Sequence, residues 1–389
     1  MKAILKPHEE IRILEGHPWI FRSEVSEILG EIKAGGIIDV YNHKNVFIGR
    51  GYLNLASKIL IRILTYQEKE VINDEFFERR IASAIKMRSD IRGNSSCRLI
   101  FSEADYLPGL IVDRYGDYIV IEISTLGMDV WRDTIVKVIR KLLNPKGIYE
   151  RSDNASRKKE GLEPVLGFIG EEFNPNIIIE ENGFKMHVDL ANGQKTGYFL
   201  DQTENRANLK NYVKGKKVLD CFSHTGAFGI HAAGYEAKEV TSVEISHLAV
   251  EKIKENIALN GFDNIKVIED DAFHYLDEAY SNGERFDVII LDPPAFTKNK
   301  DTIKQAYLGY QKINTLGLKM LNPGGYLITF SCSGNMTQDL FLEMLKNACN
   351  KAKKQVQLIE YRLQTKDHPM LLANMDTLYL KCAVVRVCE

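Results

Sequence analysis

Paired cysteine motifs, long apolar runs and a strong excess of charge are all missing from this chain of 389 residues. None of the six cysteines belongs to a C-x-x-C pair, so neither a zinc site nor a disulfide framework is indicated. No apolar run approaches the roughly 18 residues of a membrane span, and the N-terminal stretch has no long apolar core or cleavage site. We therefore expect a cytoplasmic protein with reduced thiols, no metal and no membrane association.

The charge is almost balanced, with a formal net charge of -2 at pH 7. Such a chain has no general attraction to nucleic acid, so an RNA partner would have to be held by local patches. Two short basic clusters, at 151–159 and 214–217, are candidates, although each could also be an ordinary solvated face. Length alone predicts two or three domains, because 389 residues exceed the size at which a single core stops growing.

The pattern of apolar residues divides the chain into three predicted domains of an α/β protein. Residues 1–70 contain short strand patterns separated by glycine and asparagine turns, which predicts a small β-barrel with strands at 11–14, 36–41, 46–52 and 59–64. Residues 71–175 predict a small α+β domain, with helices at 74–92 and 131–143 around strands near 98–123. Residues 176–389 alternate strands and helices, which predicts a doubly wound parallel sheet.

The segment Gly16-His17-Pro18-Trp19-Ile20-Phe21-Arg22 holds one of only two tryptophans. It resembles the start of a PUA domain, a compact β-barrel that binds structured RNA in modification enzymes, and the resemblance covers residues 4–65. This resemblance implies RNA contacts from Trp19 and Arg22. Charge does not add support, since residues 1–75 hold 10 lysines and arginines against 11 aspartates and glutamates. A purely structural barrel therefore stays open as an alternative.

The C-terminal domain opens with a strand at 213–220, a loop of small residues and a helix start. Gly226 and Gly229 in this stretch allow a ligand and a neighbouring strand to approach the backbone closely. Such a loop could serve a dinucleotide, S-adenosyl-L-methionine (SAM) or tight packing alone. It lacks the G-x-G-x-x-G arrangement that nicotinamide dehydrogenases favour.

Three acidic residues follow consecutive predicted strands, and their order narrows these choices. Asp220 and Glu244 end the first two strands, and a carboxylate in the position of Glu244 can accept hydrogen bonds from both ribose hydroxyls. Asp271 follows the third strand and precedes Ala272-Phe273, a string suited to an adenine amino group and ring face. The pattern resembles the class I SAM-dependent methyltransferase fold over residues 190–389. The resemblance implies SAM as cofactor and the following contact residues: Gln194, Tyr198, Asp220, Phe222, Gly226, Glu244, Asp271 and Asp292.

Two further strings follow the predicted strands at 286–291 and 326–330, namely Asp292-Pro293-Pro294-Ala295-Phe296 and Ser331-Cys332-Ser333. Ligands of parallel sheets bind outside the carboxyl ends of the strands, so both strings should meet at one edge. Asp292 could then hydrogen-bond a flipped base and Phe296 could stack on it, with Lys298 nearby as a further substrate contact. The simpler alternative is that the two prolines only end a strand.

Cys332 is the candidate nucleophile for chemistry on a pyrimidine. Carbon 5 of cytosine accepts a methyl group only after a thiolate adds to carbon 6 and converts the ring to an enamine. A cysteine beside a strand is often just a small buried apolar residue, and Cys221 in the cofactor loop is the second candidate.

Five strings, at 103–114, 192–206, 219–226, 292–296 and 331–333, resemble the large-subunit ribosomal RNA cytosine-5 methyltransferases with a PUA domain. The resemblance implies methylation of a cytosine of 23S rRNA through a covalent bond from Cys332 to carbon 6, with Asp292 as the second catalytic residue. Many RNA cytosine-5 methyltransferases of another family carry a second cysteine beside the proline motif, where this chain has Ala295 and Phe296.

Two other functions remain open from the sequence. Asp-Pro-Pro followed by an aromatic residue also suits methylation of an exocyclic amine, N2 of guanine or N6 of adenine, which needs no thiol. A non-catalytic RNA-binding or ribosome assembly factor is the alternative from another class, although the intact series of acids argues against it. The oligomeric state is left open between a monomer and a homodimer.

Overall fold

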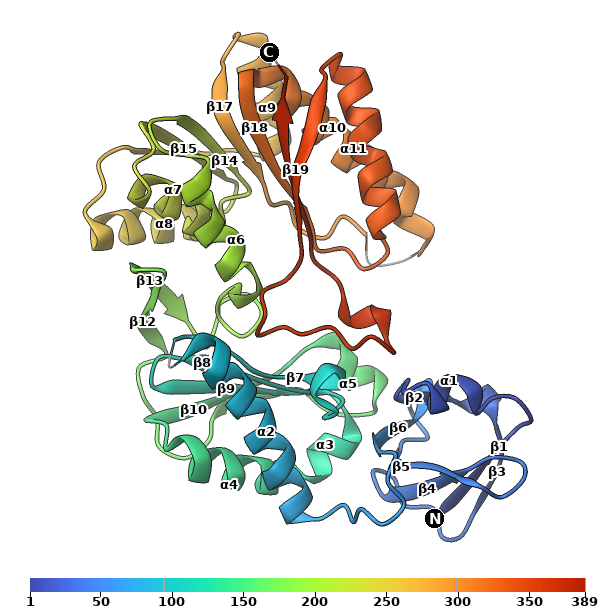
Figure 1. The fold of residues 1–389 in the computed structure, drawn as a ribbon. Coiled ribbons are helices and arrows are strands. Elements are labelled where there is room, and N and C mark those ends of the chain that lie inside the picture. Colours follow the sequence, from blue (N-terminus) through green and yellow to red (C-terminus); the bar gives the residue numbers. More distant parts are fainter. Residues whose placement is uncertain (94, 298–299, 389) are drawn as a thin grey trace. The chain divides into compact units, whose positions relative to one another are not determined.

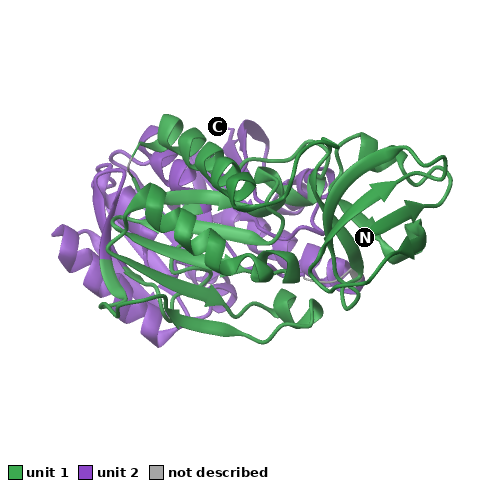
Figure 2. Ribbon diagram, turned by 90° about the horizontal axis from the view of Figure 1, so that it is seen from below, with its two compact units in different colours: residues 1–177, 188–200, 366–377 green, residues 178–187, 201–365, 378–389 purple. Residues whose placement is uncertain are grey.

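The computed structural model describes residues 1–93, 95–297 and 300–388. The chain forms two compact units and crosses between them after residues 177, 187, 200, 365 and 377 (Figure 2). Unit 1 comprises residues 1–177, 188–200 and 366–377. Unit 2 comprises residues 178–187, 201–365 and 378–389. No helix in the described ranges is long and apolar enough to cross a membrane.

The N-terminal part of unit 1 is a six-stranded sheet in the order β2-β6-β5-β4-β1-β3 (Figure 1). Its strands are β1 (Lys2–Leu5), β2 (Trp19–Phe21), β3 (Val25–Leu29), β4 (Ile37–Tyr41), β5 (Phe47–Leu53) and β6 (Ile59–Thr65). One prediction here is wrong, because Ile11–Leu14 forms the short helix α1 and not a strand. Only Ile13 of this segment is buried while Ile11 and Leu14 are exposed, so its apparent alternation does not correspond to two faces of a sheet.

The second part of unit 1 is a five-stranded sheet in the order β11-β10-β9-β8-β7. Its strands are β7 (Cys97–Phe101), β8 (Leu110–Tyr115), β9 (Tyr118–Ile123), β10 (Gly147–Ser152) and β11 (Val165–Phe168). Its helices are α2 (Asp74–Arg92), α3 (Leu126–Val130), α4 (Arg132–Leu143) and α5 (Ala155–Lys159). Asn73 caps α2 by accepting a hydrogen bond from the Phe76 amide at 3.0 Å, and Phe76 and Phe77 then pack into the core with Ile139 of α4. The helices and strands predicted for this region are confirmed.

The N-terminal sheet and the α+β part share side chains within unit 1. Tyr52 of β5 packs in the core formed by α2, α4 and their sheet, and its hydroxyl donates a hydrogen bond to the Pro108 carbonyl at 2.8 Å. A buried ion pair joins Arg62 of β6 to Glu160 at 2.8 Å. A short hairpin of β12 (Asn176–Glu181) and β13 (Phe184–Asp189) follows.

Unit 2 is built on a seven-stranded sheet in the order β16-β15-β14-β17-β18-β20-β19. Its strands are β14 (Lys217–Cys221), β15 (Glu239–Glu244), β16 (Ile265–Glu269), β17 (Phe286–Leu291), β18 (Leu321–Ser331), β19 (Val356–Arg362) and β20 (Lys381–Val387). The first five in spatial order are parallel, and β20 is antiparallel to both of its neighbours. The expected α/β methyltransferase-like fold is thereby confirmed. Strand β14 begins at Lys217 and not at Val213, because the polar residues 214–216 form a turn.

Helices cover both faces of this sheet (Figure 1). They are α6 (Thr203–Asn208), α7 (Ala227–Gly234), α8 (His247–Asn260), α9 (Ala272–Ser281), α10 (Ile303–Met320) and α11 (Gln338–Ala352). Successive strand residues alternate between two cores: Leu219 packs in the core with α9, α10 and α11, and Val218 packs in the core with α7. Strand tips in the middle of the sheet therefore lie between two helical layers, which is where ligands bind in folds of this kind.

Candidate functional site

Asp220, at the end of β14, is a fully buried carboxyl group with one unused oxygen. Its Oδ2 accepts a hydrogen bond from the Gly229 amide at 3.1 Å, whereas Oδ1 is buried without a hydrogen-bond partner among the described residues. Burial, reinforced by the nearby Asp292 and Glu244, raises the pKa of Asp220 to about 7. A buried acceptor without a donor is costly, so the position suits a donor group supplied by a ligand.

The loop after β14 has an unusual backbone that Glu244 holds in place. Phe222, His224 and Gly226 all have positive φ angles, of 63°, 51° and 85°. The carboxylate of Glu244 accepts hydrogen bonds from the His224 amide at 2.8 Å and from the Ser246 amide at 2.9 Å. A carboxylate has about four lone-pair sites, so these two bonds leave capacity for ribose hydroxyls.

Asp271 serves as the N-cap of α9. Its Oδ1 accepts hydrogen bonds from the amides of Phe273 and His274, at 2.9 and 3.1 Å. Aspartate is a preferred N-cap residue, so this structural role accounts in part for the aspartate even when no ligand is bound. Its predicted contact to the adenine ring stays a prediction.

Aromatic rings gather beside these tips. Phe273 lies 6.2 Å from Phe222 and 5.7 Å from Phe296 between ring centroids, and Phe296 packs on Tyr310 at 4.5 Å. A residue predicted for the cofactor, Phe222, and one predicted for the substrate, Phe296, thus share one cluster, with their rings 6.4 Å apart.

Asp292 follows β17 and is half-buried. Its Oδ2 accepts a hydrogen bond from Nε2 of Gln202 at 3.1 Å. Gln202 is itself buried, and its Oε1 accepts a hydrogen bond from Asn205 Nδ2 at 2.7 Å. Both residues belong to the string 192–206 that carries the family resemblance, although neither had a role predicted from the sequence.

The turn Ser331-Cys332-Ser333 is held by two buried residues that were not predicted from the sequence. The Tyr310 hydroxyl lies 3.1 Å from the hydroxyl oxygens of both Ser331 and Ser333. Nζ of Lys381 donates to the Ser333 carbonyl at 2.7 Å and to the Tyr379 carbonyl at 2.8 Å. Burial lowers the pKa of Lys381 to about 8, although interaction with Cys332 opposes the shift. A lysine at the start of the apolar run 381–387 was the available signal.

Cys332 itself is half-buried and packs against the apolar core on the α7 face of the sheet. Phe296 packs against the core on the opposite face. The second candidate, Cys221, is fully buried, and burial raises the pKa of its thiol well above the usual value.

The remaining predicted contacts lie in unit 1 or outside the described residues. Gln194 is exposed, whereas Tyr198 is buried and its amide donates to the Tyr115 hydroxyl at 3.2 Å. Trp19 donates its indole N–H to Glu103 at 2.9 Å, and exposed Arg22 donates to the Leu55 carbonyl at 2.6 Å. Lys298 falls outside the described residues.

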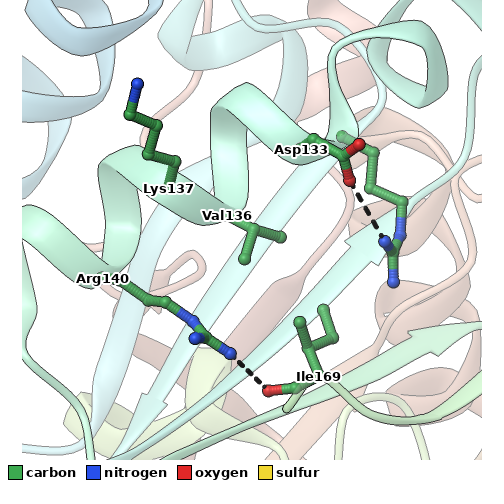
Figure 3. Close-up of a pocket in the computed structure, with 6 residues that line it drawn as sticks. Asp133, Val136, Lys137, Arg140 and Ile169 are labelled. Carbon is green, nitrogen blue, oxygen red and sulfur yellow. Dashed lines mark hydrogen bonds and ion pairs between the residues drawn. The ribbon is translucent and has the colours of Figure 1, made fainter.

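A cavity of about 350 Å³ in unit 1 contains none of the predicted site residues (Figure 3). It is lined by Arg132, Asp133, Val136, Lys137, Arg140 and Ile169. Arg132 lies 3.6 Å from the Asp133 carboxylate, and Arg140 donates to the Ile169 carbonyl at 2.8 Å, as the dashed lines in Figure 3 show. Of these two arginines only Arg132 is paired with carboxylates, Glu150 at 2.6 Å and Asp133 at 3.6 Å, whereas the partner of Arg140 is a neutral carbonyl.

The chain matches two family models, a PUA-like domain over residues 3–66 and Conserved hypothetical protein 95 over residues 207–362. It is 43% identical over 390 residues to ribosomal RNA large subunit methyltransferase I of Shewanella denitrificans, covering 98% of each chain. The protein of the same name from Klebsiella pneumoniae is 40% identical and covers 99% of this chain and 98% of its own.

Two solved structures match the entire chain and show the same fold. One, from Streptococcus mutans, is 24% identical with a TM-score of 0.84 and full coverage of both chains. The other, SMU.776 in complex with SAH, is also 24% identical with a TM-score of 0.86 and full coverage.

These comparisons correct the expected function. The function expected from the sequence was methylation of a cytosine of 23S rRNA through a covalent bond between Cys332 and carbon 6. The relatives and the matched family model support the broader reaction, SAM-dependent methylation directed at ribosomal RNA, and give no basis for the covalent adduct. The broader reaction is therefore the function stated for this chain. The expected cofactor, SAM, is confirmed.

Proposed function

The chain belongs to the ribosomal RNA large subunit methyltransferase I family, and from this premise we propose that it transfers the methyl group of SAM to a base of large-subunit ribosomal RNA. The observation that carries the proposal is the row of carboxylates at the tips of adjacent parallel strands. Glu244 and Asp220 lie in the last two residues of β15 and β14, and Asp271 and Asp292 follow β16 and β17. The four strands are neighbours in the order β16-β15-β14-β17. A site of this kind lies where an α/β sheet binds its ligands.

The residues present fit SAM. Glu244 has lone pairs left for ribose hydroxyls, and the buried Oδ1 of Asp220 suits the ammonium group of the methionine part. When bound, SAM supplies an electrophilic methyl group on a sulfonium. Glu244 and Asp220 would bind and orient this cofactor.

At the substrate end we propose that Asp292 hydrogen-bonds the polar edge of a flipped base and that Phe296 stacks on it. Carbon 5 of a cytosine is the target atom that we propose, in line with the family resemblance of the strings at 292–296 and 331–333. Cys332 stays a predicted catalytic residue, since its turn lies on the next strand and its side chain is partly exposed.

The PUA-like domain is proposed to contact the RNA. Arg22 is exposed, with its guanidinium only partly used by the Leu55 carbonyl. Trp19 uses its indole N–H for Glu103, so it would offer RNA a ring face and not a hydrogen bond.

The direct test combines calorimetry of SAM binding with transfer of tritiated methyl groups to large-subunit rRNA from cells that lack the gene. We expect Glu244→Gln to weaken SAM binding about tenfold, because a charge-assisted acceptor of ribose hydroxyls becomes neutral. Glu251→Gln, on the exposed side of α8, is the matched control and should bind normally. Asp292→Asn should bind SAM but transfer methyl groups poorly. Failure of the wild-type protein to bind SAM would instead favour a non-catalytic RNA-binding factor.

A further inference from the structure

Three buried or half-buried polar side chains form a line of hydrogen bonds that ends on Asp292. Gln202, Asn205 and Arg362 come from the turn before α6, from α6 itself and from the end of β19. The bonds run from Arg362 Nε to Asn205 Oδ1 at 3.0 Å, from Asn205 Nδ2 to Gln202 Oε1 at 2.7 Å, and from Gln202 Nε2 to Asp292 Oδ2 at 3.1 Å.

Arg362, at the end of the line away from Asp292, fixes which side chain donates and which accepts in each hydrogen bond. A guanidinium can only donate, so the oxygen of the Asn205 amide must face Arg362. The nitrogen of the same amide also lies 3.3 Å from the Leu363 carbonyl, which can only accept. Both neighbours therefore require the same orientation of Asn205. Gln202 must then present its oxygen to Asn205 and its nitrogen to Asp292.

Arg362 is itself anchored. It donates to Glu360 at 3.0 Å and to the Glu204 carbonyl at 3.4 Å. Burial raises the pKa of Glu360, but hydrogen bonds from the Tyr212 hydroxyl and from Arg362 outweigh this effect and hold the pKa below its usual value. Glu360 thus stays a carboxylate, and the guanidinium keeps its position.

We infer that Gln202, Asn205 and Arg362 are positioning residues that orient Asp292 and present it to the substrate as a hydrogen-bond acceptor. The inference rests on the proposed function, because it assigns Asp292 to the substrate end of the site. It adds the reason why an aspartate there keeps one orientation: its Oδ2 accepts a hydrogen bond from Gln202, whose own orientation is fixed by Asn205.

Other titratable groups also face Asp292 and bear on a pH profile. Asp220 of β14 and Cys382 of β20 both interact electrostatically with Asp292. Loss of the Gln202 donor removes a hydrogen bond to the charged form of Asp292, so the acid limb of the pH–rate profile should move to higher pH. Wild-type protein contains the same titration of Asp220, so the difference between the wild-type and Gln202→Ala profiles reports the shift at Asp292.

The experiment measures kcat, KM for SAM and RNA, and the pH profile for Gln202→Ala, Asn205→Asp, Arg362→Met and Arg362→Lys. Asn205→Asp keeps an oxygen for Arg362 but loses the donor to Gln202, so it breaks the line while preserving a charged pair that supports folding. We expect Gln202→Ala, Asn205→Asp and Arg362→Met to lower kcat roughly 10- to 100-fold at unchanged SAM affinity. Arg362→Lys should retain most activity. Asn211→Ala, an exposed amide bonded only to Asn208 among the bonds described, is the control.

The outcomes separate the inference from the proposed function. If Asp292→Asn is inactive while Gln202→Ala and Asn205→Asp keep the wild-type kcat and pH profile, the inference is overturned and the proposed function stands. If Asp292→Asn is fully active, the assignment of Asp292 fails and the inference fails with it. If Gln202→Ala does not fold, Asn205→Asp decides between these outcomes.

Discussion

At the scale of single residues, the site is dominated by negative charge that must be kept apart or neutralised. Asp220 and Asp292 end neighbouring strands, and each disfavours ionisation of the other. Gln202 supplies a donor to Asp292, whereas the buried Oδ1 of Asp220 has no donor among the residues described. The difference suits the two proposed roles, one carboxyl group facing the substrate and the other facing the cofactor.

Asp220 makes the stability of the ligand-free protein depend on pH. Its pKa is about 7 in the folded state, against 3.8 as the ordinary value, so between these values the folded state holds a proton that the unfolded state has lost. Its contribution to the free energy of unfolding therefore falls as pH rises from about 4 to about 7. Asp220→Asn does not titrate. The free energy of unfolding of Asp220→Asn minus that of wild type, measured in urea, should therefore increase by up to about 4 kcal/mol from pH 4 to pH 8. A difference that is constant with pH would contradict this account.

Lys381 should control the reactivity of Cys332. A buried ammonium beside a thiol stabilises the thiolate and lowers the thiol pKa. Lys381→Met should slow alkylation of Cys332 by iodoacetamide several-fold at pH 7.5, and Lys381→Arg should largely preserve the rate. The measurement needs a Cys388→Ser background, because Cys388 is the other cysteine that is not buried. Equal alkylation rates for the Met and Arg variants would show that the charge of Lys381 does not act on Cys332.

At the scale of elements, the loop from β14 to α7 depends on close packing as well as on backbone conformation. A Cβ added to Gly229 would lie 2.5 Å from Ser242 Oγ and 3.3 Å from Asp220 Oδ2. The helix would have to move away from β15 and from the Asp220 carboxylate. The glycine therefore fixes the distance between the first turn of α7 and the sheet.

Gly229→Ala should lower the free energy of unfolding by about 1–3 kcal/mol and weaken SAM binding, because overpacking shifts the backbone at Asp220. Gly334→Ala is the control, since a Cβ there meets nothing within 4 Å. Urea unfolding and calorimetry measure the two effects. Equal stability of the two variants would show that α7 can move away from β15 at little cost.

The residues at the ends of the strands could be predicted from the sequence, whereas the side chains that hydrogen-bond with them or with the adjoining turns could not. Asp220, Glu244 and Asp292 follow apolar strand patterns, and a local pattern is sufficient to place such residues at the edge of a sheet. Gln202 and Lys381 reach the same edge from far along the chain, through contacts of 90 and 48 residues' separation. No local periodicity reports such contacts. The strand predicted at 11–14 was wrong for the opposite reason. These four residues have a local pattern that suits a strand, but they form a short helix.

At the scale of the whole molecule, the two units share one chain in an interleaved order. The predicted boundaries at 70 and 175 stay predictions, but the segments 188–200 and 366–377 belong to unit 1. Asp367 is fully buried there and accepts hydrogen bonds from the Arg98 amide at 2.9 Å and, through its carbonyl, from Arg88 at 3.1 Å. Thr196 donates to the buried Asp113 at 2.6 Å.

A fragment of residues 176–389, the predicted methyltransferase domain, should therefore be less stable than the full chain. It would lack Arg98 and Asp113, the unit 1 residues to which Asp367 and Thr196 are hydrogen-bonded, so the segments 188–200 and 366–377 would lose the contacts that hold them. We expect a lower melting temperature and faster proteolysis within 188–200 and 366–377 than in the full chain. A fragment that melts cooperatively at the temperature of the full chain, with both segments protected, would contradict the interleaved arrangement.

The central claim is methyl transfer from SAM to a base of large-subunit rRNA, and the most direct measurement identifies the methylated nucleoside. Purified protein is incubated with SAM and with 23S or 16S rRNA from cells that lack the gene, and the digested RNA is analysed by mass spectrometry. The account predicts one new methyl group per 23S molecule, found as 5-methylcytidine, and none in 16S rRNA. A methyl group on an exocyclic amine would contradict the proposed target atom, and absence of any methylation of 23S rRNA would contradict the function itself.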